Sequence, residues 1–227
     1  REARVRYAEH AGELEGADII IIPGTKNTIE DLIQLRNRGI DAAIIRHARA
    51  GGVVLGICGG YQMLADTLSD PLHIESRIPE VAGLGLLDMT VSFLPDKKTV
   101  QTHAVIEDKQ GWLAPLNGMT LDGYEIHAGE NHLGRQAVPW LMARGEVDGV
   151  RNPRGNVIGC YLHGLFDNGH LWQALVRRVQ ETKGLASGNS PVLTMEQLRE
   201  RAFDQVADVV RNTVDMEAVY EILRGER

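Results

Sequence analysis

The sequence lacks long apolar stretches and clusters of positive charge. Its longest apolar run, around residues 19–23, is far too short to span a bilayer, and no charged-then-apolar leader precedes it. The formal net charge is -7, with no cluster of lysine or arginine, which argues against nucleic acid or an anionic membrane as the main partner. We therefore expect a cytoplasmic protein without a nucleic-acid or membrane partner.

Cysteines and cofactor motifs are also scarce. The two cysteines, Cys58 and Cys160, could pair, but a reducing compartment favours free thiols, and we interpret Cys160 as a packing residue within an apolar strand. The sequence has no G-x-x-x-x-G-K-[ST] phosphate loop and no metal-ligand cluster. We expect no metal and no cofactor in these residues.

The remaining composition is ordinary for a soluble globular protein. The 227 residues are 43% hydrophobic and 24% charged, with no internal repeat, which predicts one domain over residues 1–227. Because the sequence begins at Arg1 instead of methionine, we expect it to be a piece of a longer protein.

Apolar patterns predict an α/β unit near the start of the chain. Residues 17–23 are typical of a central parallel strand, and residues 53–57 of a second buried strand. Between them lie two predicted helices, one capped by Thr28 with Asp31 and one beginning near Asp41. Strand, helices and strand describe a crossover, so both strands should end at the same edge of the sheet, where α/β proteins build ligand sites.

The rest of the chain predicts shorter strands and a helical end. We expect the strand candidates at residues 86–93 and 99–106 to be antiparallel additions. Further strand candidates are a short piece at residues 5–7 and strands at 140–144 and 157–162, with a turn at 152–155. Helices are predicted at 171–179, from Thr194 to about 210, and at 216–223.

The sequence GGVVLGICGGYQMLAD, residues 51–66, predicts a strand that turns abruptly into a helix with Cys58 at the corner. The glycines around the turn permit close backbone approach, as in the elbow that exposes a hydrolase nucleophile. A helix N-terminus favours a thiolate and a developing oxyanion, so we interpret Cys58 as a nucleophile. The alternative is a free cysteine packed in the core.

A thiol nucleophile needs a base, and histidine is the usual partner. His163 is the best placed of eight histidines, because it follows the predicted strand 157–162 and precedes Gly164. His127 is the second candidate, and His103 lies within a strand pattern. The others are typical of surface or helix positions: His10, His47, His73, His132 and His170.

Four motifs occur in the order PGTKNTIEDL, GICGGYQML, GYEIHAGE and CYLHGLFDN, followed by a helical tail that contains Asp215-Met216. Together they resemble the C-terminal glutamine amidotransferase domain of the cobyric acid synthase family over nearly the whole chain. The resemblance implies a class I glutamine amidotransferase, flavodoxin-like α/β fold, with a mostly parallel sheet flanked by helices and a helical tail from about residue 194. It also implies a glutaminase that works through a cysteine thioester.

The resemblance carries site roles to matching positions. Cys58 matches the family's nucleophile and His163 its catalytic histidine. The backbone around Gly24 and Thr25, with the amide of Gly59, matches the oxyanion site.

Gln62 matches a position associated with holding the glutamine substrate. Its alternative is a solvent-facing helix residue, and for Gly24 and Thr25 the alternative is an ordinary turn and cap.

One position departs from the wider class. Triad amidotransferases carry a glutamate two residues beyond the histidine, where this chain has Leu165. The cobyric acid synthase branch is similar in lacking it, which implies a Cys–His dyad. Glu125 and Asp167 could orient His163, but each is equally plausible as a surface or structural group, and Glu125 and His127 are kept as accessory candidates.

The resemblance also implies partners. An N-terminal ATP-dependent synthetase domain, absent from this chain, would bind ATP, Mg²⁺ and the corrinoid, and would use ammonia from L-glutamine to amidate carboxylates of adenosylcobyrinic a,c-diamide. Three alternatives stay open: a cysteine hydrolase of another kind, a related amidotransferase with another acceptor, and a decayed scaffold domain.

Overall fold

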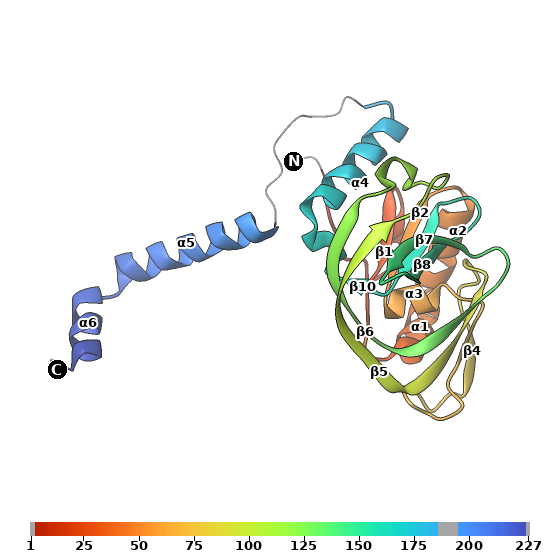
Figure 1. The fold of residues 1–227 in the computed structure, drawn as a ribbon, viewed down its shortest axis with the longest axis horizontal. Coiled ribbons are helices and arrows are strands. Elements are labelled where there is room, and N and C mark those ends of the chain that lie inside the picture. The colour runs from red at the N-terminus through yellow and green to blue at the C-terminus, as the bar shows by residue number, and fades with distance from the viewer. Residues whose placement is uncertain (1–2, 186–194, 226–227) are drawn as a thin grey trace.

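The computed structural model describes residues 3–185 and 195–225, without the side chains of residues 96–99, 195 and 196. It contains a ten-stranded sheet with helices on both faces (Figure 1). The strands are β1 (Ile19–Ile22), β2 (Val53–Ile57), β3 (Thr67–Ser69), β4 (Glu80–Ala82), β5 (Met89–Ile106), β6 (Thr120–Leu133), β7 (Val138–Ala143), β8 (Glu146–Arg151), β9 (Val157–Cys160) and β10 (Leu162–His163). The α-helices are α1 (Thr28–Asn37), α2 (Ile40–Arg49), α3 (Gly59–Met63), α4 (Gly169–Thr182), α5 (Met195–Thr213) and α6 (Met216–Arg224), and short 3₁₀ helices are η1 (Ala11–Leu14), η2 (Ala114–Leu116) and η3 (Leu165–Asp167).

Three adjacent parallel strands form the part of the sheet that positions the site. β2 pairs with β1 on one side and with β9 on the other, with Ile19 opposite Val53 and Leu55 opposite Ile158. The expected crossover between β1 and β2 is therefore confirmed. Because parallel strands end at the same edge of a sheet, the residues that follow β1, β2 and β9 come together there.

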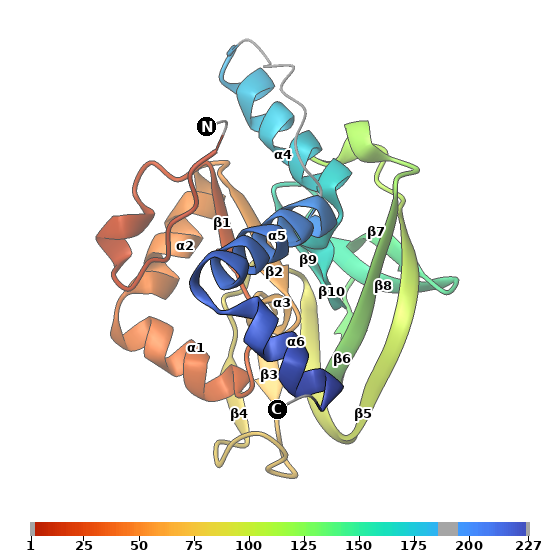
Figure 2. The same cartoon turned by 90° about the vertical axis from the view of Figure 1, so that its left-hand side faces the viewer.

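The antiparallel additions are also confirmed. The order of the main path is β1-β2-β9-β8-β7-β5-β3-β4, and β6 pairs with β5 and with β10. β5 and β6 form a long curved ribbon beside the three parallel strands (Figure 2). The sheet is thus mixed, with parallel strands near the site and mainly antiparallel strands beyond them.

Two apolar layers cover the faces of the sheet. Val54 of β2 packs with residues of α1 and α2 such as Leu32 and Ile44. The next residue, Leu55, points to the other face and packs with Leu171 of α4. This alternation follows from the period-two geometry of a strand, and it explains why residues 53–57 are apolar throughout.

Several predictions at the start of the chain were wrong. Residues 3–8 form no strand, and Tyr7 is 97% exposed. β1 is parallel but lies at the end of the strand order, and Ile21 is 36% exposed, so its run of isoleucines gave a false signal of burial on both faces. The cap of α1 is Asn27, whose side chain accepts a hydrogen bond from the Glu30 amide at 3.1 Å, and not Thr28.

The strands predicted at residues 86–93 and 99–106 belong to one long strand, β5, which begins at Met89 and shifts register against β6 after Ser92. β3, β4 and β8 were not predicted. The turn at residues 152–155 is confirmed, and Gly155 there has a φ of +77°.

The C-terminal helices extend away from the sheet and its covering helices (Figure 1). The amphipathic pattern that predicts α5 and α6 leaves large apolar side chains exposed on them: Leu198, Phe203, Val206, Val209, Val210, Tyr220, Ile222 and Leu223. The expected cap at Thr194 and the loop at residues 187–191 lie outside the described residues. None of the described helices has the length and apolar character needed to cross a membrane.

Candidate active site

Cys58 occupies a strained turn between β2 and α3. Its φ of 52° and ψ of -113° lie outside the regions that residues with a Cβ prefer. Gly60 allows α3 to lie close to β1 after this turn, because any Cβ at that position would lie 2.0 Å from the carbonyl oxygen of Ile22. The expected elbow with a cysteine at the start of a helix is therefore confirmed.

The environment of Cys58 favours the neutral thiol. The residue is 7% exposed, and burial raises the pKa of its thiol to about 11, against the smaller opposite effect of a hydrogen bond from the Gly59 backbone. The expectation that the helix start favours a thiolate is wrong for the resting domain, because desolvation outweighs the backbone dipoles of a five-residue helix. A base must therefore take the proton during attack.

His163 lies next to Cys58. If Gly24 had a Cβ, it would lie 3.2 Å from His163 Cε1 and 3.4 Å from Cys58 Cβ, so both side chains face the same point beyond the end of β1. The strand predicted at residues 157–162 is interrupted at Tyr161, but His163 lies at a strand terminus as expected, at the end of β10, and Gly164 after it has a φ of +76°. Its Nε2 atom is buried and has no hydrogen-bond partner.

Burial lowers the pKa of His163, and a hydrogen bond with the Ile126 backbone only partly opposes this effect. The imidazole is therefore neutral at neutral pH and can accept a proton. A protonated thiol and a neutral imidazole form a pair in which the proton moves only when the sulfur attacks.

The oxyanion candidates Gly24, Thr25 and Gly59 lie together at the same edge. A Cβ on Gly59 would lie 2.6 Å from Thr25 Cγ2 and 3.1 Å from the Thr25 backbone nitrogen. Two backbone segments, one after β1 and one after β2, thus meet beside Cys58. Backbone N–H groups placed in this way can stabilise an oxyanion.

Gln62 is a buried member of the same region, one helical turn after Cys58. It is 2% exposed, which excludes a solvent-facing position. Its Oε1 accepts a hydrogen bond from Thr28 at 3.0 Å, and its Nε2 donates to the Ala128 carbonyl at 3.2 Å and to the Tyr161 hydroxyl at 3.4 Å. These bonds join α1, α3, β6 and the segment between β9 and β10.

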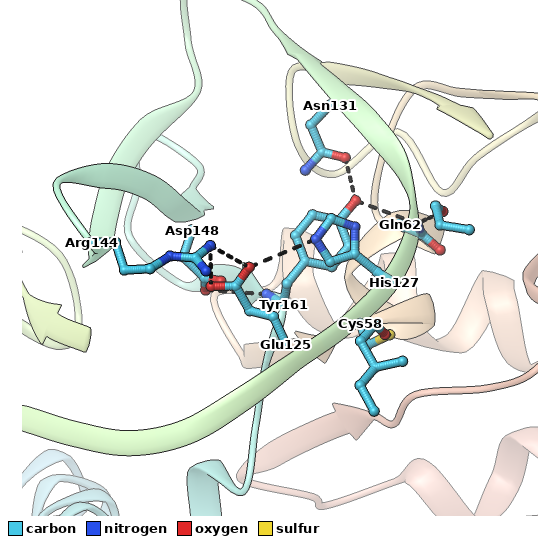
Figure 3. Close-up of polar contacts among 10 residues, drawn as sticks. Cys58, Gln62, Glu125, His127, Asn131, Arg144, Asp148 and Tyr161 are labelled. Atoms are coloured by element: carbon cyan, nitrogen blue, oxygen red, sulfur yellow. Dashed lines mark hydrogen bonds and ion pairs between the residues drawn. The ribbon is translucent and has the colours of Figure 1, made fainter. Parts of the chain in front are cut away.

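Glu125 and His127 belong to a largely buried polar cluster (Figure 3). Because side chains alternate along a strand, they lie on the face of β6 opposite Tyr124. Arg144 Nη2 lies 3.2 Å from Glu125 Oε2, and His127 Nε2 lies 3.9 Å from the same oxygen. Glu125 is thus a structural group and not a surface one, and its bonds run to Arg144 and His127, not to His163. Asp167, the other carboxylate considered, is exposed.

Two further members of this cluster were missed. The ring of Tyr161 stacks on His127 with centroids 3.7 Å apart, and its hydroxyl donates to Asn131 Oδ1 at 2.5 Å. Asp148 accepts a hydrogen bond from the Tyr161 amide at 3.2 Å, and burial together with the Glu125 charge raises its pKa to about 7. Tyr161 could have been suspected as a member of this cluster, because it stands two residues before His163 in the sequence. Asp148 gave no such signal, because its place in the sequence is typical of a turn.

Cys160 is fully buried in β9 and, like Cys58, is a free thiol. Across residues 3–185 and 195–225, no group of His, Cys, Asp or Glu is arranged to hold a metal ion.

Comparison with known proteins shows which family this chain resembles. The sequence model of the CobB/CobQ-like glutamine amidotransferase domain matches residues 1–171. A cobyric acid synthase from Citrobacter koseri is 41% identical over 231 residues, which cover 100% of this chain and 45% of the relative. One from Clostridium acetobutylicum is 35% identical over 98% of this chain and 44% of its own length. The chain thus spans about half the length of these relatives.

Solved structures share the fold at lower identity. A glutamine amidotransferase crystal structure has a TM-score of 0.58 at 20% identity, over 76% of this chain and 84% of its own. The PurLQS structure from Thermotoga maritima has a TM-score of 0.52 at 18% identity, over 74% of this chain and 79% of its own. These likenesses confirm the predicted α/β amidotransferase fold.

Proposed function

The chain belongs to the CobB/CobQ-like glutamine amidotransferase family, and from this premise we propose that it is the glutaminase part of a cobyric acid synthase. It hydrolyses L-glutamine in the cytoplasm and supplies ammonia to a synthetase part of the same polypeptide. The observation that carries the proposal is the meeting of Cys58 and His163 beside Gly24, at the shared end of β1, β2 and β9.

The first half of the reaction forms a thioester. Cys58 Sγ attacks the side-chain amide carbon of glutamine while His163 takes the thiol proton, which the neutral imidazole can accept. Negative charge on the amide oxygen is stabilised by the backbone N–H groups of Gly59 and Thr25. His163 then gives the proton to the leaving nitrogen, and ammonia departs as the carbon–nitrogen bond breaks.

The second half releases glutamate. Water attacks the thioester carbon while His163 accepts one of its protons, and the carbon–sulfur bond breaks with return of that proton to Cys58 Sγ. The site works as a dyad because Glu125 is paired with Arg144 and the Asp167 side chain is exposed. The thiol and imidazole end in the protonation states in which they began.

We propose that the ammonia acceptor binds outside this chain. The sequence has no phosphate-loop motif, and the described residues include no group of His, Cys, Asp or Glu arranged to hold a metal ion, which supports placing ATP with Mg²⁺ elsewhere. We assign ATP, Mg²⁺ and the corrinoid acceptor, adenosylcobyrinic a,c-diamide, to the synthetase part of the polypeptide. The acceptor identity is supported by the cobyric acid synthase relatives.

The test uses the full-length polypeptide with ATP, Mg²⁺ and the corrinoid, and compares glutamine with ammonium chloride as nitrogen source. The Cys58→Ala variant should lose amidation from glutamine and retain amidation from ammonia. Equal activity of the variant with both sources would overturn the proposal. A Cys160→Ala variant is the control, and it should use both sources as the wild type does.

A further inference from the structure

Within the residues that the structure describes, no carboxylate is paired with His163 to orient it. Burial lowers its pKa and a hydrogen bond with the Ile126 backbone partly opposes this, and neither influence comes from a negative side chain. No ion pair joins His163 to an acidic residue within the described part of the chain. The Glu125 carboxylate is held by Arg144 on the other face of β6, and Asp167 is exposed.

An aromatic ring lies against the imidazole instead. The rings of Tyr124 and His163 are stacked, with centroids 5.1 Å apart and an angle of 6° between their planes. The two residues are directly opposite each other in the antiparallel pairing of β6 with β10, so the backbone register fixes the contact. Parallel, offset ring pairs of this kind are favourable beyond the area that they bury.

The backbone beside this pair is built for close approach. A Cβ on Gly123 would lie 2.2 Å from the carbonyl oxygen of His163, so a larger residue there would move β6 away from β10. The hydrogen bond with the Ile126 backbone holds the imidazole from the same strand. Together the two contacts restrict rotation of the ring while its Nε2 atom keeps no partner.

We propose that Tyr124 is the positioning residue of His163, and that its stacked ring takes the orienting role that a carboxylate has in a triad. This inference rests on the proposed function, because it assigns a role within the same dyad. Tyr124 acts through the histidine and does not touch the reacting atoms. A ring contact orients the imidazole without adding a negative charge, which keeps the neutral form available as a base.

The exposed position of Tyr124 also allows its ring to be removed with little effect on the core. Tyr124 is 38% exposed, so removing its ring leaves no large cavity in the core. Tyr124→Phe keeps the ring and removes only the hydroxyl, and Tyr124→Ala removes the stack. Tyr220→Ala, at an exposed tyrosine of α6, is the matched control for loss of a tyrosine elsewhere.

The first readout is the rate at which 6-diazo-5-oxo-L-norleucine, a glutamine-mimicking alkylator, modifies Cys58 in the full-length polypeptide. Tyr124→Ala should slow the reaction by about threefold to tenfold, the range expected for loss of one aromatic pair, and Tyr124→Phe should react at nearly the wild-type rate. An unchanged rate in Tyr124→Ala would overturn the inference. Failure of the wild type itself to react would count against the proposed function.

The second readout is the pKa of His163, followed by NMR of its ring proton with selective histidine labelling, which needs no substrate. The groups that face the imidazole are Cys58 from the β2–α3 turn and Tyr124 from β6, with Asp167 beside Gly164. Because burial lowers this pKa, Tyr124→Ala should raise it toward 6.5, and Tyr124→Phe should leave it low. The same pKa in all variants would contradict the positioning role even if the alkylation rates differed.

Discussion

The thiol of Cys58 donates a hydrogen bond to the backbone carbonyl of Ile126 at 3.4 Å, across a sequence separation of 68 residues. The same backbone position hydrogen-bonds with His163. β6 therefore lies over both members of the proposed dyad and keeps Cys58 only 7% exposed. The resting dyad is closed and uncharged, and five predictions follow from this state and from the buried groups around it.

The backbone strain at Cys58 predicts an unusual order of stability. A residue with a Cβ at a φ of 52° and a ψ of -113° costs about 1–3 kcal/mol, and glycine avoids this cost. Cys58→Gly should therefore have a free energy of unfolding about 1 kcal/mol above that of Cys58→Ala, measured by urea denaturation.

Cys160 is the matched control, because it is a buried cysteine in a regular strand. There the usual order should hold, with the alanine variant more stable than the glycine variant by about 0.5–1 kcal/mol. The same order at both cysteines would show that the elbow holds no strain.

The pKa of the Cys58 thiol predicts slow alkylation at neutral pH. With that pKa raised to about 11, the thiolate fraction should rise about tenfold per pH unit between pH 7 and 10, and so should the rate of reaction with iodoacetamide. Peptide mapping of the modified protein measures this rate. A plateau near pH 7 would mean that the resting cysteine is a thiolate.

The loss of glutamine hydrolysis at acidic pH should reflect protonation of His163. Because burial lowers its pKa below 6.5, kcat/KM should hold down to about that pH and fall as the imidazole becomes protonated at lower pH. His163→Asn should abolish most activity, and His127→Asn, which changes the cluster on the other face of β6, should reduce activity less. The reverse order of severity would identify His127 as the base.

Removing the amide of Gln62 should lower the stability of the domain. Gln62→Leu leaves the Thr28 hydroxyl and the Ala128 carbonyl without this buried partner, which should cost about 1–3 kcal/mol in the free energy of unfolding. Gln34→Leu, at an exposed glutamine of α1, is the control in the same urea experiment. If Gln62→Leu changed only the KM for glutamine, its role would be to hold the substrate.

The raised pKa of Asp148 should make the free energy of unfolding depend on pH. Its pKa is about 7 in the folded state against 3.8 ordinarily, so between these pH values folding retains a proton that the unfolded chain releases. The wild type should therefore lose stability as pH rises through this window, relative to Asp148→Asn, by on the order of 2–4 kcal/mol. Urea denaturation at pH 4.5 and pH 8 measures the change.

Asp204→Asn on the exposed side of α5 controls for the loss of one negative charge. A stability difference between wild type and Asp148→Asn that is the same at both pH values would contradict the assigned pKa.

The sequence predicted those parts of the fold whose signals are local. Runs of aliphatic residues mark β1 and β2, glycines mark the elbow at Cys58, and these local signals place two of the three strand ends that form the site. The edge position of β1 could not be predicted, because strand order depends on pairing between distant segments.

The polar cluster behind the site could not be predicted for a similar reason. Arg144 lies in the turn between β7 and β8, where the sequence indicates a surface charge, yet it pairs with Glu125 across 19 residues. Asp148 lies in β8, a strand with mixed polar character that gave no clear pattern. The stacking of Tyr124 on His163 likewise depends on the register of β6 with β10, which no local pattern specifies.

The most direct test of the account is intact-mass spectrometry of the full-length polypeptide after exposure to 6-diazo-5-oxo-L-norleucine, with peptide mapping of the product. We expect one adduct, on Cys58, that excess glutamine prevents and that His163→Asn strongly slows. An adduct at another residue, or no adduct under conditions in which iodoacetamide still modifies Cys58, would contradict it.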